Sequence, residues 1–174
     1  MSDGNIIVRV ATKDDAVRVQ ELRKIGWQDN YVYPKGGVTP ELLRDKLAIL
    51  PLPQEDVDHF VKMISHLENK GKNLVAVCNG EVKGVVFHDT LDSGNGDIGV
   101  FVDRDSRGKG VGKKLLSELI KVSDKQLEVS IFALNKSRGL YREYGFKEVG
   151  EEFNHYFDDS VYLPVQRLVR KASV

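Results

Sequence analysis

The chain begins with a short run of hydrophobic residues typical of a strand, followed by hydrophobic residues at helical spacing. Residues Ile6 to Val10 are apolar and β-branched, which predicts a short strand. Thr12 offers a helix N-cap with Asp15 three residues later, and apolar residues then recur at helical spacing as far as Ile25. We therefore expect a strand followed by an amphipathic helix of roughly 13 residues.

The next hydrophobic segments are separated by turn-forming residues. The stretch from Trp27 to Gly37 is aromatic and then turn-rich, which predicts a loop. Thr39 and Pro40 predict the start of a helix that continues through Leu50, until the following prolines end it. A further helix is predicted over residues 54–69, because its apolar residues lie on one face.

The second half of the chain begins with a predicted hairpin. Two apolar runs, 74–78 and 82–88, flank Asn79-Gly80, a dipeptide typical of a two-residue hairpin turn. The later elements are predicted to be strands at 98–102 and 127–132, helices at 111–120 and 136–144, and strand-like runs at 147–154 and 161–170. This order predicts one α/β domain over residues 1–174, with a mixed central sheet flanked by helices.

Composition narrows the class of protein. The 174 residues include 26 basic and 26 acidic ones, so the net charge is zero and no basic field favours nucleic acid or an anionic membrane. The chain has no apolar run long enough to cross a bilayer, and its first residues lack the pattern of a signal peptide. Cys78 is the lone cysteine, which excludes an internal disulfide and a multi-cysteine zinc site. We expect a cytoplasmic protein without a metal.

A glycine-rich loop lies between a predicted strand and a predicted helix. Its glycines let the backbone approach a ligand, and the N–H groups that open the helix favour an anion. The spacing fits neither a Walker loop nor a dinucleotide fingerprint, so we expect a different phosphate-bearing ligand. The loop and the first helical residues are Arg107, Gly108, Lys109, Gly110, Val111, Gly112, Lys113 and Lys114.

The motif Arg107-x-x-Gly110-x-Gly112 resembles the Q/R-x-x-G-x-G/A loop of the GNAT superfamily of N-acetyltransferases. Asn135, Tyr141 and the Gly145-Phe146 pair resemble the second block of that family, with one residue fewer between the asparagine and the tyrosine. The clear similarity covers about residues 97–150. Arg104 stands where a proline is common, and a Ser or Arg replaces the usual alanine of the second block.

The resemblance implies the GNAT fold and acetyl-CoA as the co-substrate, with its pyrophosphate on the glycine loop. It further implies that backbone N–H groups of Phe101 or Val102 polarise the acetyl carbonyl, an interaction that typically changes a rate by about 10²–10³. The expected cofactor-binding residues are Phe101, Val102, Arg107, Gly108, Lys109, Gly110, Val111, Gly112, Lys113, Asn135 and Arg138.

The catalytic and acceptor residues follow in part from the resemblance. Tyr141 matches the family position of the general acid that protonates the CoA sulfur. Asp97, which opens a strand along the expected acceptor cleft, and His88 are alternative general bases, and a base acting through water is a third possibility. We expect Trp27, Tyr31 and His88 to contact the acceptor, with the aromatic rings able to hold an amine by cation–π contact.

The resulting hypothesis is an acetyl-CoA-dependent N-acetyltransferase that moves an acetyl group directly to a primary amine of a small molecule. The alternatives are transfer of a longer acyl group, a CoA-binding sensor without turnover, and a protein or peptide N-acetyltransferase. The family also makes a homodimer plausible.

Overall fold

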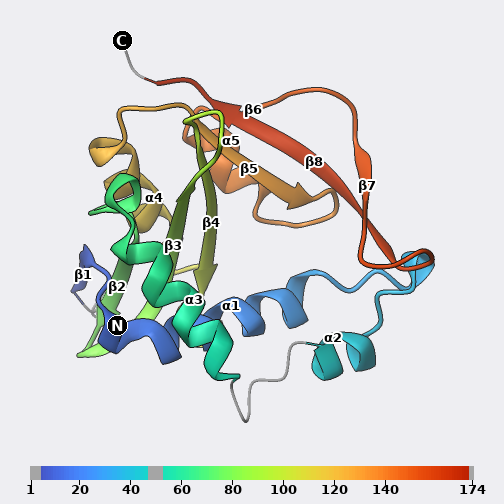
Figure 1. The fold of residues 1–174 in the computed structure, drawn as a ribbon, viewed down its shortest axis with the longest axis horizontal. Coiled ribbons are helices and arrows are strands. Elements are labelled where there is room, and N and C mark those ends of the chain that lie inside the picture. Colours follow the sequence, from blue (N-terminus) through green and yellow to red (C-terminus); the bar gives the residue numbers. More distant parts are fainter. Residues whose placement is uncertain (1–4, 47–52, 173–174) are drawn as a thin grey trace.

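The structure is a computed structural model that describes residues 5–46 and 53–172. Its strands are β1 Ile6–Val10, β2 Leu74–Cys78, β3 Glu81–Thr90, β4 Gly96–Val102, β5 Leu127–Phe132, β6 Lys147–Glu148, β7 Phe153–Tyr156 and β8 Tyr162–Arg170. They form one mixed sheet in the order β1-β2-β3-β4-β5-β8-β6, with β7 paired to β8 (Figure 1). All pairings are antiparallel except that of β4 with β5.

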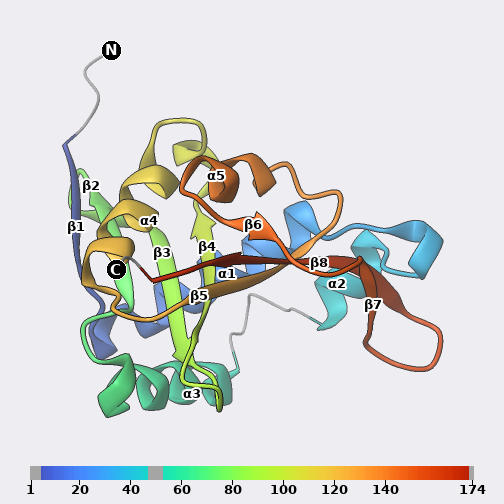
Figure 2. The ribbon, with the colours of Figure 1, turned by 90° about the horizontal axis from the view of Figure 1, so that it is seen from above.

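Helices cover both faces of this sheet. They are α1 Ala16–Asn30, α2 Pro40–Lys46, α3 Gln54–Ser65, α4 Val111–Val122 and α5 Arg138–Glu143. The view from above shows α4 on one side of the strands and α3 on the other (Figure 2). Such a mixed sheet between helical layers confirms the predicted fold class.

Two buried clusters fix the helices to the sheet. On one face, Leu115, Leu116 and Leu119 of α4 pack on strand residues such as Val86 and Leu127. The opposite face buries apolar residues of α1, α3 and the same strands, namely Ala16, Val19, Leu22, Phe60, Val75 and Val85. Because neighbouring residues of a strand alternate between these clusters, the position of each strand side chain determines which helices it meets.

The pairing between β4 and β5 is short. The parallel register joins Gly96 to Leu127 and Asp97 to Glu128. Beyond these two pairs the strands diverge, and Figure 1 shows β4 and β5 running apart from a common origin. Backbone groups on the inner edges of both strands therefore face an opening rather than each other.

Most predicted boundaries are confirmed. The β1 strand spans Ile6–Val10, Thr12 and Asp15 form the expected capping box, and the Asn79-Gly80 turn joins β2 to β3 with positive φ at both residues. The predicted loop at Trp27 is wrong, since α1 continues to Asn30 and carries the tryptophan. Tertiary contacts extend this helix, because Gly26 and Trp27 pack on β4 and on aromatic neighbours.

The other differences lie in the shorter segments. The run predicted as one strand over 147–154 is divided into β6 and β7, which pair with different parts of β8. The predicted helix over 54–69 ends at Ser65 and is followed by a 3-10 turn. The predicted continuation of α2 from Leu47 to Leu50 lies outside the described residues.

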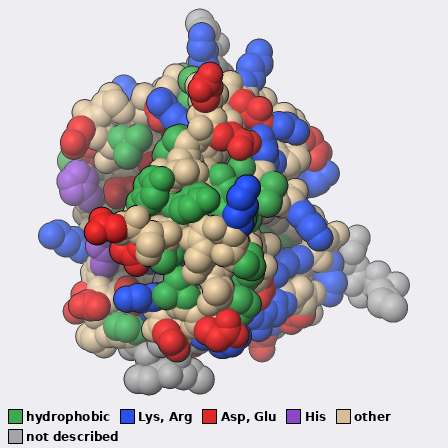
Figure 3. Space-filling model, turned by 90° about the vertical axis from the view of Figure 1, so that its right-hand side faces the viewer, with side chains coloured by type: hydrophobic (Ala, Val, Ile, Leu, Met, Phe, Trp, Pro, Cys, Tyr) green, Lys and Arg blue, Asp and Glu red, His purple; other side chains and the backbone are tan. Residues whose placement is uncertain are grey.

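The β7 edge of the molecule carries aromatic side chains. Phe153, Tyr156 and Phe157 are about half exposed. The face on the right of Figure 1, where β7 lies, gathers hydrophobic side chains near its centre with charged ones around them (Figure 3). Within the described ranges, no helix has the length and apolarity needed to cross a membrane.

Candidate active site

A cavity of about 1020 Å³ occupies the opening between β4 and β5. Its walls come from α1, α3, the loop before α4, the first turn of α4, and the segment leading into α5. The residues predicted for the site that line it are Trp27, Tyr31, Asp97, Phe101, Val102, Arg107, Gly108, Gly110, Val111, Gly112, Lys113, Asn135 and Tyr141. The opening that β4 and β5 leave between them is thus lined by residues that are more than 100 positions apart in the sequence.

The glycine loop forms one end of the cavity. Gly108 and Gly110 adopt φ values of 75° and 84°, which side chains disfavour. Gly110 is the N-cap of α4 and has no side chain to occupy the N–H groups of the first turn. At Gly112 a Cβ atom would lie 3.3 Å from Leu140, so a larger residue would crowd the helix start. The loop therefore presents free backbone donors and a helix dipole to an anion.

The side-chain charges of this loop are largely neutralised by partners. Arg107 donates from Nε to the carbonyl of Val102 at 3.0 Å and pairs with Asp29 at 2.8 Å. Hydrogen bonds from Arg104, and then from Arg107, hold the pKa of the Asp29 carboxyl below its usual range. Lys113 pairs with Glu143 at 2.8 Å. The backbone donors, more than a net positive field, distinguish this end of the cavity.

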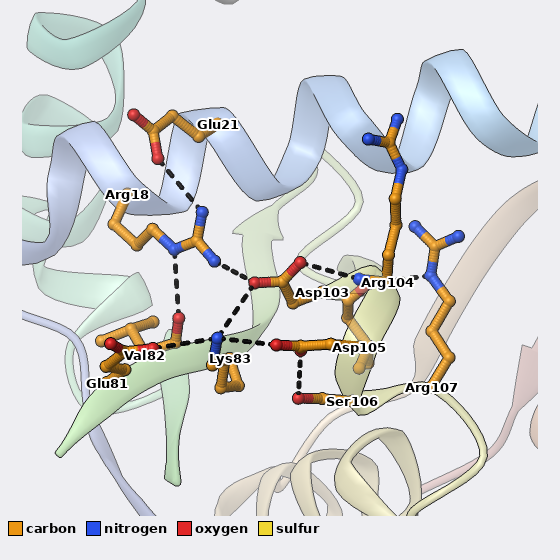
Figure 4. A network of polar contacts seen from close by, with 11 residues as sticks. Arg18, Glu21, Glu81, Val82, Lys83, Asp103, Arg104, Asp105, Ser106 and Arg107 are labelled. Atoms are coloured by element: carbon orange, nitrogen blue, oxygen red, sulfur yellow. Dashed lines mark hydrogen bonds and ion pairs between the residues drawn. The ribbon is translucent and has the colours of Figure 1, made fainter. Parts of the chain in front are cut away.

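A polar network fixes the turn that leads into the loop (Figure 4). Arg18 of α1 bonds the carboxylate of Asp103 and, from Nε, the carbonyl of Val82 at 3.1 Å. Lys83 of β3 reaches Asp105 at 3.0 Å, and Asp103 accepts from the N–H of Arg104 at 2.8 Å. Helix α1 and strand β3 thereby hold both ends of the 3-10 turn Arg104–Ser106.

Successive N–H groups of β4 point to opposite sides of the strand, and this alternation determines which of them face the cavity. The N–H of Asp103 donates to Lys83 of β3 at 2.8 Å, whereas the N–H of Gly96 donates to Gln126, just before β5, at 2.9 Å. Because N–H groups alternate along a strand, the N–H of Phe101 points to β3 and that of Val102 points to the opening. Val100 shares the direction of Val102, and sequence reasoning missed it. Counting two residues back from Val102 would have found it.

Tyr141 of α5 reaches the same edge of β4. Its phenol oxygen accepts a hydrogen bond from the N–H of Val100 at 3.3 Å, and its ring packs edge-on against Phe146. The side chain is buried, and this burial, with a smaller contribution from Tyr31, raises the pKa of Tyr141. The phenol therefore holds its proton at neutral pH and has a proton to donate.

Asp97 lies at the other end of the cavity, where β4 and β5 separate. Loss of hydration, followed by the charges of Asp89 and Glu128, raises the pKa of Asp97 to about 6. A carboxyl with this pKa is largely ionised at neutral pH and still basic enough to accept a proton. Asp89 is its cross-strand partner and also lines the cavity.

Aromatic residues line the side formed by α1. Trp27 and Tyr31 stack with ring centroids 4.1 Å apart, and Phe157 meets Trp27 edge-on. Burial raises the pKa of Tyr31, while a hydrogen bond with Asn135 acts in the opposite direction. Trp27, Tyr31 directly after α1, and Asn135 before α5 all line the cavity and form one wall.

Three residues predicted for the site do not line the cavity. Lys109 is exposed on the loop. Arg138 turns away because it bonds the carbonyl of Ala133 and the carboxylate of Glu148. His88 is buried on the α4 face of β3, where it meets the Gly96 position, whereas its neighbours Phe87 and Asp89 line the cavity.

The cavity also contains residues that sequence reasoning did not select. They come from α1 and α3 and include Gln20, Arg23, Asn30, Asp56, His59 and Met63. Gln20, Arg23, Trp27 and Asn30 recur at spacings of three and four, so helix periodicity would have placed them on the face of Trp27. No group of His, Cys, Asp and Glu within the described ranges is arranged to hold a metal ion.

The sequence model of the acetyltransferase (GNAT) domain matches residues 49–158, which is well over half of the chain. The chain belongs to the GNAT acetyltransferase family and is an acyltransferase. A search of curated proteins finds no match.

Solved structures share the fold at low sequence identity. A phosphinothricin acetyltransferase from Sinorhizobium meliloti in complex with acetyl-CoA superposes with a TM-score of 0.72 at 21% identity, over 96% of this chain and 88% of that one. YncA, a putative acetyltransferase from Salmonella typhimurium with its cofactor acetyl-CoA, gives 0.71 at 19% identity, over 98% and 95%. A GNAT-family acetyltransferase from Streptococcus pneumoniae gives 0.70 at 19%, over 97% and 100%.

Proposed function

We propose that the protein transfers the acetyl group of acetyl-CoA to a primary amine of a small molecule, directly and within a ternary complex. The observation that carries this proposal is that one cavity contains the glycine loop, the β4 amides, Tyr141 and Asp97. An anion site, a carbonyl site, an acid and a base thus lie along a single path. The family match and the acetyl-CoA complexes of proteins with this fold support the choice of co-substrate.

The residues at the glycine loop fit the pyrophosphate of acetyl-CoA. The first turn of α4 offers backbone donors behind Gly110. Apart from the chain neighbours, no atom of the described residues lies within 4 Å of a Cβ position at Gly108 or Gly110. Open space beside free N–H groups at a helix start suits a phosphate-bearing ligand. Asn135 and Leu140 line the facing wall of the cavity.

The thioester carbonyl needs a hydrogen-bond donor where negative charge develops. The N–H groups of Val100 and Val102 are candidates, because the alternation along β4 directs both toward the opening. The N–H group of Val100 donates to the phenol oxygen of Tyr141. We infer that these amides polarise the carbonyl, while Phe101 contributes its ring and not its N–H group.

The transfer then requires two proton movements. The amine nitrogen forms a bond to the carbonyl carbon and the carbon–sulfur bond breaks, so that the sulfur leaves with the electron pair. We assign Tyr141 as the acid that gives its phenolic proton to this sulfur, and Asp97 as the base that takes the proton lost by the amine. The buried, protonated phenol and the carboxyl with a pKa near 6 suit these opposite roles.

The lining of the acceptor side suits a small molecule. Gln20 and Trp27 of α1 line the same cavity as Met63 of α3 and Phe87 of β3, so these side chains are available to one small acceptor. We also propose that residues 1–174 form one N-acetyltransferase domain, since a single sheet includes elements from β1 to β8. The expected cytoplasmic location and homodimer stay predictions.

Calorimetry with acetyl-CoA tests the first part of this function. The wild-type protein should bind acetyl-CoA, and a Gly110→Asp/Gly112→Asp double variant should not, because carboxylates would face the phosphates. A thiol-release assay over polyamines, aminoglycosides, amino acids and peptides tests the second part. Absence of binding by the folded wild-type protein would refute the proposal, and a preference for succinyl- or propionyl-CoA would correct the acyl group.

A further inference from the structure

Arg23 is unusual among the charged residues of the cavity. Its Nη1 atom donates to the amide oxygen of Gln20 at 3.1 Å, and it forms no ion pair with any residue in the described ranges. By contrast, Arg107 at the glycine loop is paired with Asp29. A half-buried guanidinium beside a neutral amide retains its capacity for a bidentate bond to an anion.

The surrounding carboxylates do not neutralise Arg23. Asp56 of α3 lines the same cavity but pairs with Lys24 at 2.6 Å. Asp89 accepts a hydrogen bond from Asn69 at 2.8 Å and lies opposite Asp97 on the sheet. The cavity therefore contains a guanidinium that has no ionic partner among the described residues and, on another wall, two carboxylates side by side.

Gln20 holds the guanidinium in place from the same helix. It is 1% exposed and lines the cavity three residues before Arg23, so the two side chains lie on one helix face. Trp27, one turn further along, adds an apolar surface beside them. A buried amide that orients a guanidinium with no ionic partner in residues 5–46 and 53–172 is costly unless a ligand uses that charge.

The carboxylate pair defines where the amine goes. Like charges directly opposite on neighbouring strands destabilise a sheet, and a cationic or hydrogen-donating group between them relieves the repulsion. An acceptor amine at Asp97 is also at the proposed base. Arg23 of α1 lines the same cavity and is therefore available to the remainder of such an acceptor.

We propose that the acceptor is a small amine that also carries an anionic group, as an amino acid does, and that Arg23 binds this anion while Asp97 and Asp89 receive the amine. This inference rests on the proposed N-acetyltransferase function and names the substrate class of the same cavity. Arg23 is a binding residue that determines specificity, and it takes no part in the proton transfers.

Matched acceptors test the anion requirement. Thiol release is measured with acetyl-CoA and the common amino acids that have a primary amine and no thiol, and again with their α-carboxamides, which keep the amine and lose the charge of the α-carboxylate. The best amino acid should exceed its carboxamide by about 10- to 100-fold in kcat/KM, the range of a hydrogen bond between charged groups. Equal rates for acid and carboxamide, or faster acetylation of peptide amides, would overturn the proposal.

Variants then assign the effect to Arg23. Arg23→Gln should raise KM for the best amino acid by a similar factor and leave its carboxamide unchanged, while Arg23→Lys should retain part of the preference. Arg44→Gln, an exposed residue of α2 outside the cavity, is the matched control and should resemble the wild type. An equal change for both acceptors in Arg23→Gln would contradict the assignment.

Acetyl-CoA binding separates this inference from the function on which it rests. Calorimetry should give the same acetyl-CoA affinity for the wild type and Arg23→Gln. Titration of the best amino acid into the CoA-bound protein should show binding to the wild type and at least tenfold weaker binding to Arg23→Gln. A wild type that acetylates only amines without an anionic group would keep the proposed function and overturn the anion site.

Discussion

The N–H group of Val100 donates to the phenol oxygen of Tyr141 across 3.3 Å, which joins the inner edge of β4 to α5. This contact brings an amide suited to a carbonyl oxygen within reach of a phenol suited to a leaving sulfur. It forms because β4 and β5 separate after two residue pairs, so the amide of Val100 has no strand partner on that side.

Removal of the Tyr141 hydroxyl should affect chemistry more than binding. Tyr141→Phe is expected to lower kcat by about 10²–10³, because proton transfer from a positioned acid contributes on this scale. Acetyl-CoA affinity by calorimetry should change little, since the ring stays in place against Phe146. Tyr156→Phe, an exposed residue of β7, serves as the control. A kcat equal to that of the wild type would remove Tyr141 from the mechanism.

The pH dependence should report Asp97. The kcat/KM of the wild type is expected to rise as the pH increases through about 6, because the base acts in its ionised form. Asp89→Asn should move this midpoint to lower pH, since it removes a negative charge that raises the pKa of Asp97. Asp92→Asn, in the exposed loop before β4, should leave the midpoint in place. If kcat/KM of Asp97→Asn still rose through the same pH range, a group other than Asp97 would be the general base.

Gly110 should combine a backbone requirement with a binding role. Gly110→Ala places a side chain at a φ of 84°, which costs about 1–2 kcal/mol of stability. The shifted first turn of α4 should also weaken acetyl-CoA binding by about tenfold. Gly80→Ala is the matched control, because Gly80 has a φ of 82° in the hairpin turn. It should lose similar stability in urea denaturation and retain the affinity; equal loss of affinity in both variants would contradict the role of the loop.

The ion pair of Lys113 with Glu143 should restrain the affinity for acetyl-CoA. Glu143→Gln removes a carboxylate near the anion site and releases the Lys113 ammonium, so the Kd should fall about two- to fivefold at low salt. Calorimetry is done at 20 mM and at 500 mM salt, where the screening lengths are about 20 Å and about 4 Å. The gain in acetyl-CoA affinity should be seen at 20 mM salt. Glu68→Gln, on the exposed turn after α3, should show none. An unchanged Kd would mean that backbone donors act alone.

His88 should influence stability and not turnover. Burial, with the nearby charge of Lys72, lowers the pKa of His88 to about 4, so the unfolded chain binds the proton more tightly. The free energy of unfolding should therefore fall as the pH decreases from about 6.5 to about 4, by about 2 kcal/mol by pH 4.5. Urea denaturation at pH 7.5 and at pH 4.5 gives the stability lost between these two pH values. This loss should be smaller for His88→Leu than for the wild type. If kcat of His88→Leu at pH 7.5 were much lower than that of the wild type, His88 would have a role in turnover.

The sequence predicted the elements well where local patterns dominate. The β1 and β5 boundaries, the hairpin turn and the glycine loop depend on neighbouring residues, and the structure reproduces them. Trp27 is predicted in a loop because the stretch from Trp27 to Gly37 is aromatic and then turn-rich. Contacts across space, namely Gly26 on Phe101 and Trp27 on Tyr31, continue α1 past Gly26.

Side-chain direction was harder to predict than element type. Strand alternation separates His88 from Phe87 and Asp89, but the face that meets α1 is known only once the helices are placed on the sheet. Arg138 stands in a motif position, yet a carboxylate on β6 draws it away from the cavity. The loop cations likewise have partners, such as Asp29 and Glu143, that are distant in sequence.

The short ladder between β4 and β5 also has a mechanical consequence. Two residue pairs are the backbone connection between the strands on either side of the cavity. A ligand seated in the opening, with contacts to β4 and to the segment after β5, acts as a removable cross-link between them and stabilises the folded state in proportion to its occupancy. Hydrogen exchange along the inner edges of both strands would then measure how firmly the molecule holds its substrate.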